Sequence, residues 1–299
     1  MALTEALSRL QKQLGQINLT DLPKRHVGVN RCQRAQCLTR MTVLEPTVML
    51  PVHGKKKIRV GEESYAAEPG EMLLLPPGIE IDIDNQPDIR VGCFESALLV
   101  FDTQTLDLFG KLHGPHFDTW HLVPQWKAVG SDAFLAAVSD WVAFSYAFDP
   151  DQMQTRHRMA ELLLILARQG VVGNLMQPVQ ARTSSRVKHI LRLDPAHDWR
   201  AADLTVKLGM SESTLRRRLR AEGCSFRDLL EDVRLEHGVE IVMATDMPIS
   251  QIAFQCGYVS QSRFAERFRK RFSLSPTDLR ATRRSSDADV IPLIRQQAS

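Results

Sequence analysis

The spacing of the hydrophobic residues changes along the chain and predicts its elements. Within residues 3–17 apolar residues recur at alternate spacings of four and three, which predicts an amphipathic helix: Leu3, Leu7, Leu10, Leu14 and Ile17. From about residue 27 to residue 102, short β-rich segments are separated by Gly, Pro, Asn and Asp, which is typical of an antiparallel sandwich or barrel. Helical spacing returns at 132–146 and 151–169. The second of these segments has an unusually wide apolar face, which favours packing against the barrel on one side and against a second copy of the chain on the other.

Residues 184–284 have helical spacing throughout and contain two pairs of short helices. In the later pair Ile249, Ile252, Ala253 and Cys256 form one apolar face, and Gly257 permits a tight turn. Ser260 or Gln261 then opens a basic helix that buries three phenylalanines at Phe264, Phe268 and Phe272. The earlier pair covers 199–209 and 212–222, with Ser211 as the N-cap of its second helix. One long helix, within 226–245, joins the two pairs. A short helix that holds an arginine-bearing helix at a fixed angle is the geometry that places side chains in a DNA major groove.

These patterns define the expected domains. The first is a β-barrel of about 25–105 with flanking helices at about 130–170, all within residues 1–170. A linker at 171–183 leads to an all-α domain at 184–284, and residues 285–299 form a tail. We therefore expect an α+β protein of two domains, the second of which carries two helix-turn-helix units.

The distribution of charge supports this division. Residues 1–182 hold 18 Lys and Arg against 20 Asp and Glu, whereas residues 183–284 hold 19 against 13. The balances of −2 and +6 indicate that the C-terminal half faces a polyanion. No apolar run approaches 18 residues and the first residues lack a signal-peptide core, so we expect a cytoplasmic protein with no membrane segment.

Cysteine and histidine provide little catalytic chemistry. Five cysteines without a Cys-x-x-Cys pair indicate reduced, mostly buried thiols, although Cys32 and Cys37 could also form a redox pair. His113, His116 and His121 do not have the spacing of a zinc motif. The run Lys55-Lys56-Lys57 is read either as a solvated turn or as the mouth of a site for an anionic ligand.

One segment of the β region resembles the second signature of the cupin barrels. Gly70, Pro76, Gly78 and Asn85 occupy the fixed positions, but Ile81 stands where that signature has a metal-binding histidine. The first cupin signature is also missing, so we expect no metal, no cofactor and no catalytic residues. The barrel interior would then be either fully packed or open to a small ligand. A metal-dependent cupin enzyme fused to a DNA-binding domain remains the alternative.

Residues 185–283 resemble the DNA-binding domain of the AraC/XylS family of bacterial transcription regulators. The resemblance rests on Met210-Ser211, Leu215, Leu219, Gly223, Ser225-Phe226, Arg234-Leu235, Ile252-Ala253, Cys256-Gly257-Tyr258, Ser260, Ser262, Phe264, Phe268, Phe272 and Ser275-Pro276. Thr205 and Gly238 depart from it, because alanine is common in the family at both positions. A cupin-like N-terminal domain is the partner that this family commonly carries.

The resemblance implies a set of DNA contacts. Its base-reading positions fall on Ser213, Arg216, Arg217, Gln261, Ser262, Arg263 and Glu266. Arg can pair with guanine, Gln with adenine and Glu with cytosine, which agrees with that role. Six other basic residues of these helices are assigned to the DNA backbone or to the solvated face: Arg218, Arg220, Arg267, Arg269, Lys270 and Arg271.

The resemblance also implies partners. They are double-stranded promoter DNA, RNA polymerase, a second copy of the chain, and an effector that is either a small molecule, including fatty-acid-like ones, or a protein antagonist. We expect two recognition helices that enter successive major grooves of a non-palindromic site, in a transcription activator whose barrel senses the effector or mediates dimerisation.

Overall fold

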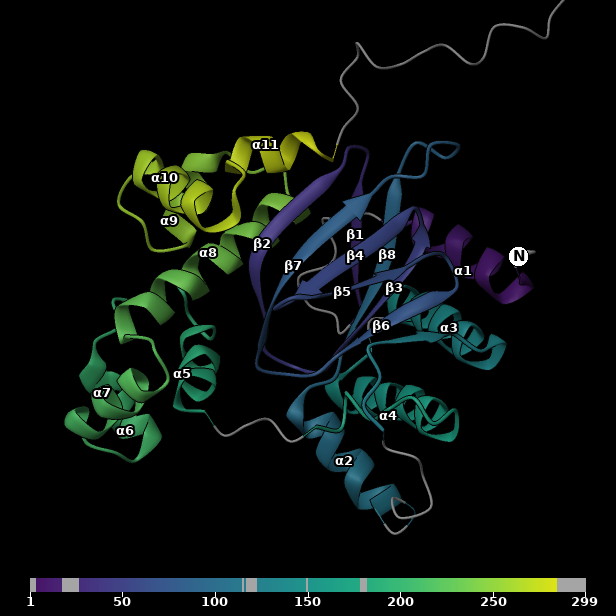
Figure 1. The fold of residues 1–299 in the computed structure, drawn as a ribbon, viewed down its shortest axis with the longest axis horizontal. Helices are drawn as coiled ribbons and strands as arrows, with labels where there is room; N and C mark the ends of the chain where they lie inside the picture. The colour runs from purple at the N-terminus through teal and green to yellow at the C-terminus, as the bar shows by residue number, and fades with distance from the viewer. Residues whose placement is uncertain are drawn as a thin grey trace, which may run out of the picture.

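The computed structural model describes residues 4–17, 27–114, 116, 123–148, 150–177 and 182–283. An N-terminal domain of two sheets and flanking helices is joined to a C-terminal domain of helices, within which the long helix α8 runs from the α6 and α7 end to the α9 and α10 end (Figure 1). The expected α+β architecture of two domains is confirmed.

The strands of the N-terminal domain form two antiparallel sheets. One has the order β1-β8-β3-β6-β9 and the other β2-β7-β4-β5. Their bounds are β1 (Val27–Cys32), β2 (Gln36–Val43), β3 (Thr47–His53), β4 (Lys55–Val60), β5 (Glu63–Ala67), β6 (Glu71–Leu75), β7 (Ile79–Gln86), β8 (Phe94–Val100) and β9 (Lys127–Val129). The three-residue strand β9 was not predicted, because so short a segment carries no alternation to detect.

The first sheet is covered on both faces. In β3, Val48 and Leu50 pack with the flanking helices, whereas Met49 lies with the residues between the two sheets. Side chains alternate between the faces of a strand, so burial of both faces explains why β3 is an almost continuous apolar run.

Four helices flank this sheet: α1 (Glu5–Gly15), α2 (Thr103–His113), α3 (Asp132–Phe148) and α4 (Gln152–Arg168). Helix α1 confirms the prediction for 3–17, since Leu7, Leu10 and Leu14 are buried in the same cluster as residues of α3 and α4. Helix α2 was not predicted. Its threonines and glycine are weak helix formers, and it depends on the packing of Phe109, which is fully buried.

The start of the predicted linker belongs to the N-terminal domain. Val172 and Leu175 are fully buried in its core, and the amide nitrogen of Asn174 donates to the carbonyl of Leu74 at 2.9 Å. The segment has the Gly and Asn content of a loop, so its sequence did not reveal that it packs. Residues 178–181, the centre of the predicted linker, lie outside the described residues.

The three consecutive lysines, 55–57, lie in a strand and not in a solvated turn. They open β4, where Lys55 and Lys57 reach the surface but Lys56 is only 1% exposed. Lys56 lies two residues before the buried Ile58, so the alternation of the strand directs both side chains to the same face.

The C-terminal domain is helical: α5 (Thr183–Leu191), α6 (Ala201–Leu208), α7 (Glu212–Ala221), α8 (Phe226–Ala244), α9 (Ile249–Gln255), α10 (Gln261–Phe272) and α11 (Pro276–Ala281). Helices α9 to α11 lie beside β2, and α6 and α7 lie at the far end of α8 (Figure 1). Across the described part of the chain, none of the helices is both apolar enough and long enough to cross a membrane.

Candidate DNA-binding interface

Local signals in the sequence position the first helix-turn-helix unit, α6 and α7. Gly209 ends α6 in the left-handed conformation, with φ of 65°. Ser211 then caps α7 by accepting a hydrogen bond from the backbone nitrogen of Thr214 at 3.2 Å. Leu215 and Leu219 are buried against the core that α5, α6 and the start of α8 form, so the remaining faces of α7 point away from it.

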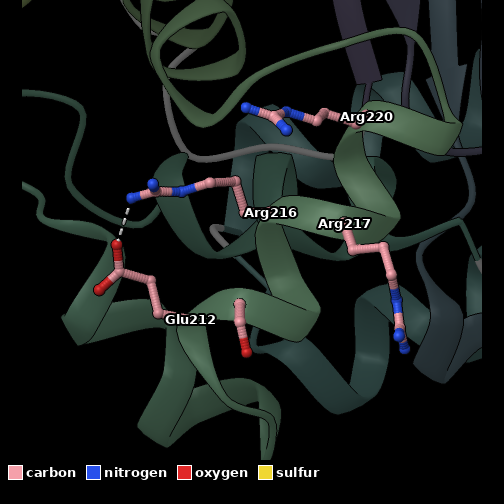
Figure 2. A pocket seen from close by; sticks show the side chains of 5 residues that line it. Glu212, Arg216, Arg217 and Arg220 are labelled. Atoms are coloured by element: carbon pink, nitrogen blue, oxygen red, sulfur yellow. Dashed lines mark hydrogen bonds and ion pairs between the residues drawn. The ribbon is translucent and has the colours of Figure 1, made fainter.

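The outward face of α7 is polar and basic. An open hollow of about 390 Å³ is lined by Glu212, Ser213, Arg216, Arg217 and Arg220. Arg216 pairs with Glu212 at 2.6 Å, whereas Arg217 points to the other side of the helix, as Figure 2 shows. The predicted base-reading residues of this helix are all exposed and line the same hollow as Arg220, although Arg216 and Arg217 point in different directions.

The second unit, α9 and α10, is built in the same way. Gly257 makes the turn with φ of 75°, and Ser260 caps α10 through the backbone nitrogen of Arg263 at 3.3 Å. The positive φ favours glycine here, and a Cβ would also lie 2.8 Å from the guanidinium of Arg234, which would have to move. Phe264, Phe268 and Phe272 are fully buried, as predicted.

The two recognition helices correspond position by position in the sequence, with an offset of 49 residues. The caps are Ser211 and Ser260, and Ser213 corresponds to Ser262. The buried positions are Leu215 with Phe264 and Leu219 with Phe268. Arg220 corresponds to Arg269, and Arg217 corresponds to Glu266. The frameworks are therefore equivalent, but a cation faces outward in one unit where a carboxylate does in the other.

The side chains predicted to read bases on α10 are also exposed. None of them is buried: Gln261, Ser262, Arg263 and Glu266. Two residues predicted to contact the DNA backbone, Arg269 and Lys270, are exposed as well. Arg267 is half-buried and pairs with Glu231 of α8 at 3.6 Å. The DNA contacts of these residues and of Arg218 on α7 remain predictions.

Arg271 requires a correction. Its side chain is 5% exposed and is enclosed by carboxylates, with Asp232 at 3.1 Å, Glu80 at 3.3 Å and Glu236 at 3.8 Å. A guanidinium held in this way does not reach a DNA phosphate. Arg271 lies seven residues after Phe264 and three after Phe268, so helical spacing places it on the buried face.

Sequence reasoning missed the cluster around Arg271. Lys188 of α5 is also buried, 3.4 Å from Asp232 and 3.9 Å from Glu236, and it donates to the hydroxyl of Thr42 in β2 at 2.8 Å. Burial raises the pKa of Glu236, and the nearby Lys188 opposes this shift. These charged groups join α5, α8 and α10 to the barrel. Their separation along the chain, from 42 to 271, left no local signal.

The barrel position that metal cupins use for histidine is apolar here. Ile81 is 1% exposed and packs in one cluster with Ile58 and Ile83. In the described ranges no three or more His, Cys, Asp and Glu residues are grouped so that they could hold a metal ion. His121 lies outside the described residues.

The cysteines do not form a reactive pair. Cys32 is buried and Cys37 is exposed, and both thiols are free. Burial raises the pKa of Cys32 to about 12 and also raises the pKa of Cys37, which disfavours the thiolate that redox chemistry needs. Of the five thiols only Cys32 and Cys256 are buried, fewer than expected.

Residues 204–282 match the model of a helix-turn-helix domain family. The chain is 33% identical over 136 residues to the HTH-type transcriptional regulator YdeO of Escherichia coli, an alignment that covers 44% of this chain and 53% of YdeO. It is 32% identical over 106 residues to the urease operon transcriptional activator of Escherichia coli, covering 35% and 36% of the two chains. The C-terminal domain is a helix-turn-helix domain of the AraC/XylS family.

The fold of both domains occurs together in a solved structure. ToxT of Vibrio cholerae matches 87% of this chain and 98% of its own with a TM-score of 0.62, at 14% sequence identity. This likeness shows a shared fold across both domains. The chain spans about half the length, or less, of the curated relatives described above, and those alignments cover 44% of this chain or less.

Proposed function

We propose that this protein is a sequence-specific DNA-binding transcription regulator. The observation that carries the proposal is the pair of equivalent recognition helices, α7 and α10, each with its polar face exposed and each fixed to the same helix, α8. The excess of positive charge in the C-terminal domain supports attraction to DNA. The names of the relatives, which are transcriptional regulators, agree with this role.

In this proposal the two helices read two neighbouring major grooves. Ser213, Arg216 and Arg217 contact base edges in one groove, and Gln261, Ser262, Arg263 and Glu266 in the next. The remaining exposed basic residues contact phosphates. Because Glu266 stands where the first unit has Arg217, the two half-sites differ in sequence and the full site is not a palindrome.

A binding assay at fixed salt tests these roles, on DNA selected from a random pool by the wild-type protein. Arg217→Ala should cost about 1–3 kcal/mol and relax the preference at one base pair, because a bidentate contact to guanine is lost. Lys270→Ala should weaken binding to all sequences alike and lower the salt slope by about 1, because it removes one phosphate contact.

Arg90→Ala is the matched control. It removes one exposed cation from the β7–β8 loop of the barrel, away from both recognition helices, and should leave affinity and specificity unchanged. Small and equal losses for Arg217→Ala and Lys270→Ala would show that the assigned roles are wrong.

The remaining parts of the proposal concern the rest of the molecule. We assign activation of transcription through RNA polymerase, since one relative is named an operon activator. We assign effector sensing or dimerisation to the N-terminal domain. A structure of ToxT with the same fold is described as bound to an unsaturated fatty acid, which supports a small-molecule effector for this architecture.

A further inference from the structure

The second sheet of the barrel is docked directly on the C-terminal domain. Backbone nitrogens of Gln33 and Arg34 donate to the carbonyl of Thr282, at 2.7 and 3.2 Å. The hydroxyl of Thr39 in β2 donates to the carbonyl of Arg271 at 3.1 Å. These contacts hold α10 and the end of α11 against the sheet, beside the apolar cluster that extends from the barrel to the second helix-turn-helix unit.

A chain of hydrogen bonds passes through this interface from the barrel interior. The amine of Lys56 donates to the Oδ1 of Asn85 at 2.7 Å, and the Nδ2 of Asn85 donates to the Oε1 of Gln36 at 2.8 Å. The Nε2 of Gln36 crosses the interface and donates to the hydroxyl of Thr282 at 3.0 Å. That hydroxyl donates in turn to the carbonyl of Leu279 in α11 at 2.7 Å.

All four hydrogen bonds in this series donate in the same direction, from Lys56 toward Leu279. The groups at the two ends of the series fix that direction. The amine of Lys56 is the donor in this contact, so Asn85 presents its oxygen to Lys56 and its nitrogen to Gln36. A backbone carbonyl has no donor, so at the other end the hydroxyl of Thr282 must donate to Leu279 and accept from Gln36. The orientation of both buried amides is therefore fixed by one residue of the barrel and one helix of the other domain.

Packing alone does not explain a lysine at position 56. Its side chain is 1% exposed. Its neighbours include the amide of Asn85, the Phe94 ring, whose centroid is 5.1 Å from the amine, and the buried thiol of Cys32. Burying an amine without a carboxylate partner is costly, and an apolar side chain would fill the same space. The residue type is explained by the hydrogen bond that orients Asn85.

We propose that Lys56 is a positioning residue for the docking of the two domains. By orienting Asn85 and Gln36 it determines how firmly the barrel holds α11, and through α11 the second helix-turn-helix unit. A change at Lys56, which lies inside one domain, is thereby transmitted to the other. An effect of this docking on DNA binding would rest on the proposed function, whereas the docking itself does not.

Hydrogen exchange of the full-length protein, followed for the amides of α11, tests the proposal. Lys56→Met and Thr282→Val should each accelerate this exchange about fivefold, the factor that corresponds to one net hydrogen bond of about 1 kcal/mol. Because both substitutions break the same chain, the double variant should exchange no faster than either single variant. If the acceleration of exchange in the double variant equals the product of the two single accelerations, the proposal is wrong.

Thr42→Val is the matched control. It removes a separate contact between the domains, the hydrogen bond from Lys188 to Thr42. In a double variant with Lys56→Met, the acceleration of exchange should equal the product of the two single accelerations. If Thr42→Val is instead as strongly coupled to Lys56→Met as Thr282→Val is, the chain has no special role and the proposal fails.

A further variant separates docking from folding of the barrel. Asn85→Asp gives Lys56 a carboxylate partner inside the barrel but removes the donor to Gln36, since an ionised carboxylate only accepts. Exchange should accelerate in α11 and remain unchanged in β3 and β8. Unchanged exchange in α11 would overturn the proposal.

Discussion

Lys270 and Arg271 are adjacent basic residues with opposite environments. Lys270 is exposed, whereas Arg271 is enclosed by Asp232, Glu80 and Glu236. Successive residues of a helix are rotated by about 100°, so one position decides between solvent and core. The number of basic residues in a recognition helix therefore does not give the number that can contact DNA.

The position equivalent to Arg271 in the first unit is Glu222, and it also has a structural role. Its carboxylate accepts hydrogen bonds from the backbone nitrogens of Thr183 and Ser184, at 2.7 and 2.9 Å, at the start of α5. Both units thus use a charged side chain, 11 residues after the capping serine, to attach the recognition helix to the rest of the domain.

Lys56 leads to a prediction about stability and pH. Burial lowers its pKa to about 7 from its ordinary value of 10.5. Between these two pH values the unfolded chain binds a proton that the folded chain has lost, so this residue makes stability rise as the pH increases. Below pH 7 both states hold the proton and the cost of burying the charge is fully present.

Urea unfolding of wild type and Lys56→Met, followed between pH 6 and pH 10, measures this effect. Wild-type stability relative to the variant should increase by several kcal/mol over this range, since one pKa unit corresponds to about 1.4 kcal/mol. The comparison cancels the titrating groups that do not interact with Lys56; the buried thiol of Cys32 does interact with it and is not cancelled. Parallel stability curves for the two proteins would contradict the prediction.

At the scale of elements, helix α8 depends on a glycine. Gly238 costs about 1 kcal/mol relative to alanine in a helix interior, but a Cβ there would lie 2.8 Å from the Cζ of Phe264. Phe264 is fully buried and also packs against Tyr258 and Phe268, so its ring has little room to move. Close approach of α10 to α8 explains the departure from the alanine common in the family.

Gly238→Ala should therefore lower the free energy of unfolding by about 1–2 kcal/mol despite the better helix former, because overpacking outweighs the gain in propensity. Gly110→Ala in α2 is the matched control. No atom lies within 4 Å of the Cβ it would add, so the same substitution should stabilise by up to about 1 kcal/mol. Chemical denaturation measures both, and stabilisation by Gly238→Ala would contradict this account of the packing.

At the scale of the whole molecule, α8 sets the distance between the two units. Its 19 residues span about 28 Å, at about 1.5 Å per residue, close to one turn of DNA at about 34 Å. The ion cluster joins α5, which packs against the first unit, to α8 and to α10 of the second unit, and this restricts the relative rotation of the two units. We expect the two half-sites to have a fixed separation.

Changing the spacing of the DNA site tests this rigidity. Insertion of 5 base pairs between the half-sites turns the second groove to the opposite side of the duplex and should lower affinity at least tenfold. Insertion of 10 base pairs should not restore it, because the helix is too short to reach the next turn. Unchanged affinity with either insertion, measured in the assay used for Arg217→Ala, would mean that the units bind independently.

The sequence determined the elements whose signals are local. The cap Ser211, the turn at Gly257 and the buried Phe264, Phe268 and Phe272 were identified correctly, because capping and helical spacing involve residues only a few positions apart. The start of α10 was predicted at Ser260 or Gln261, and the structure makes Ser260 its cap. The alternation of the β strands and the missing histidine at position 81 are local in the same sense.

Only the tertiary structure decided which polar residues are internal. Lys56 reaches Thr282 through Asn85 and Gln36, and Arg271 meets Glu80 of the barrel, across separations of about two hundred residues. These contacts dock the domains. The linker begins later than its composition indicates, because Val172 and Leu175 pack in the N-terminal core. Whether a charged side chain is solvated depends on what the fold places opposite it, and that neighbour is not specified by the residues adjacent in the sequence.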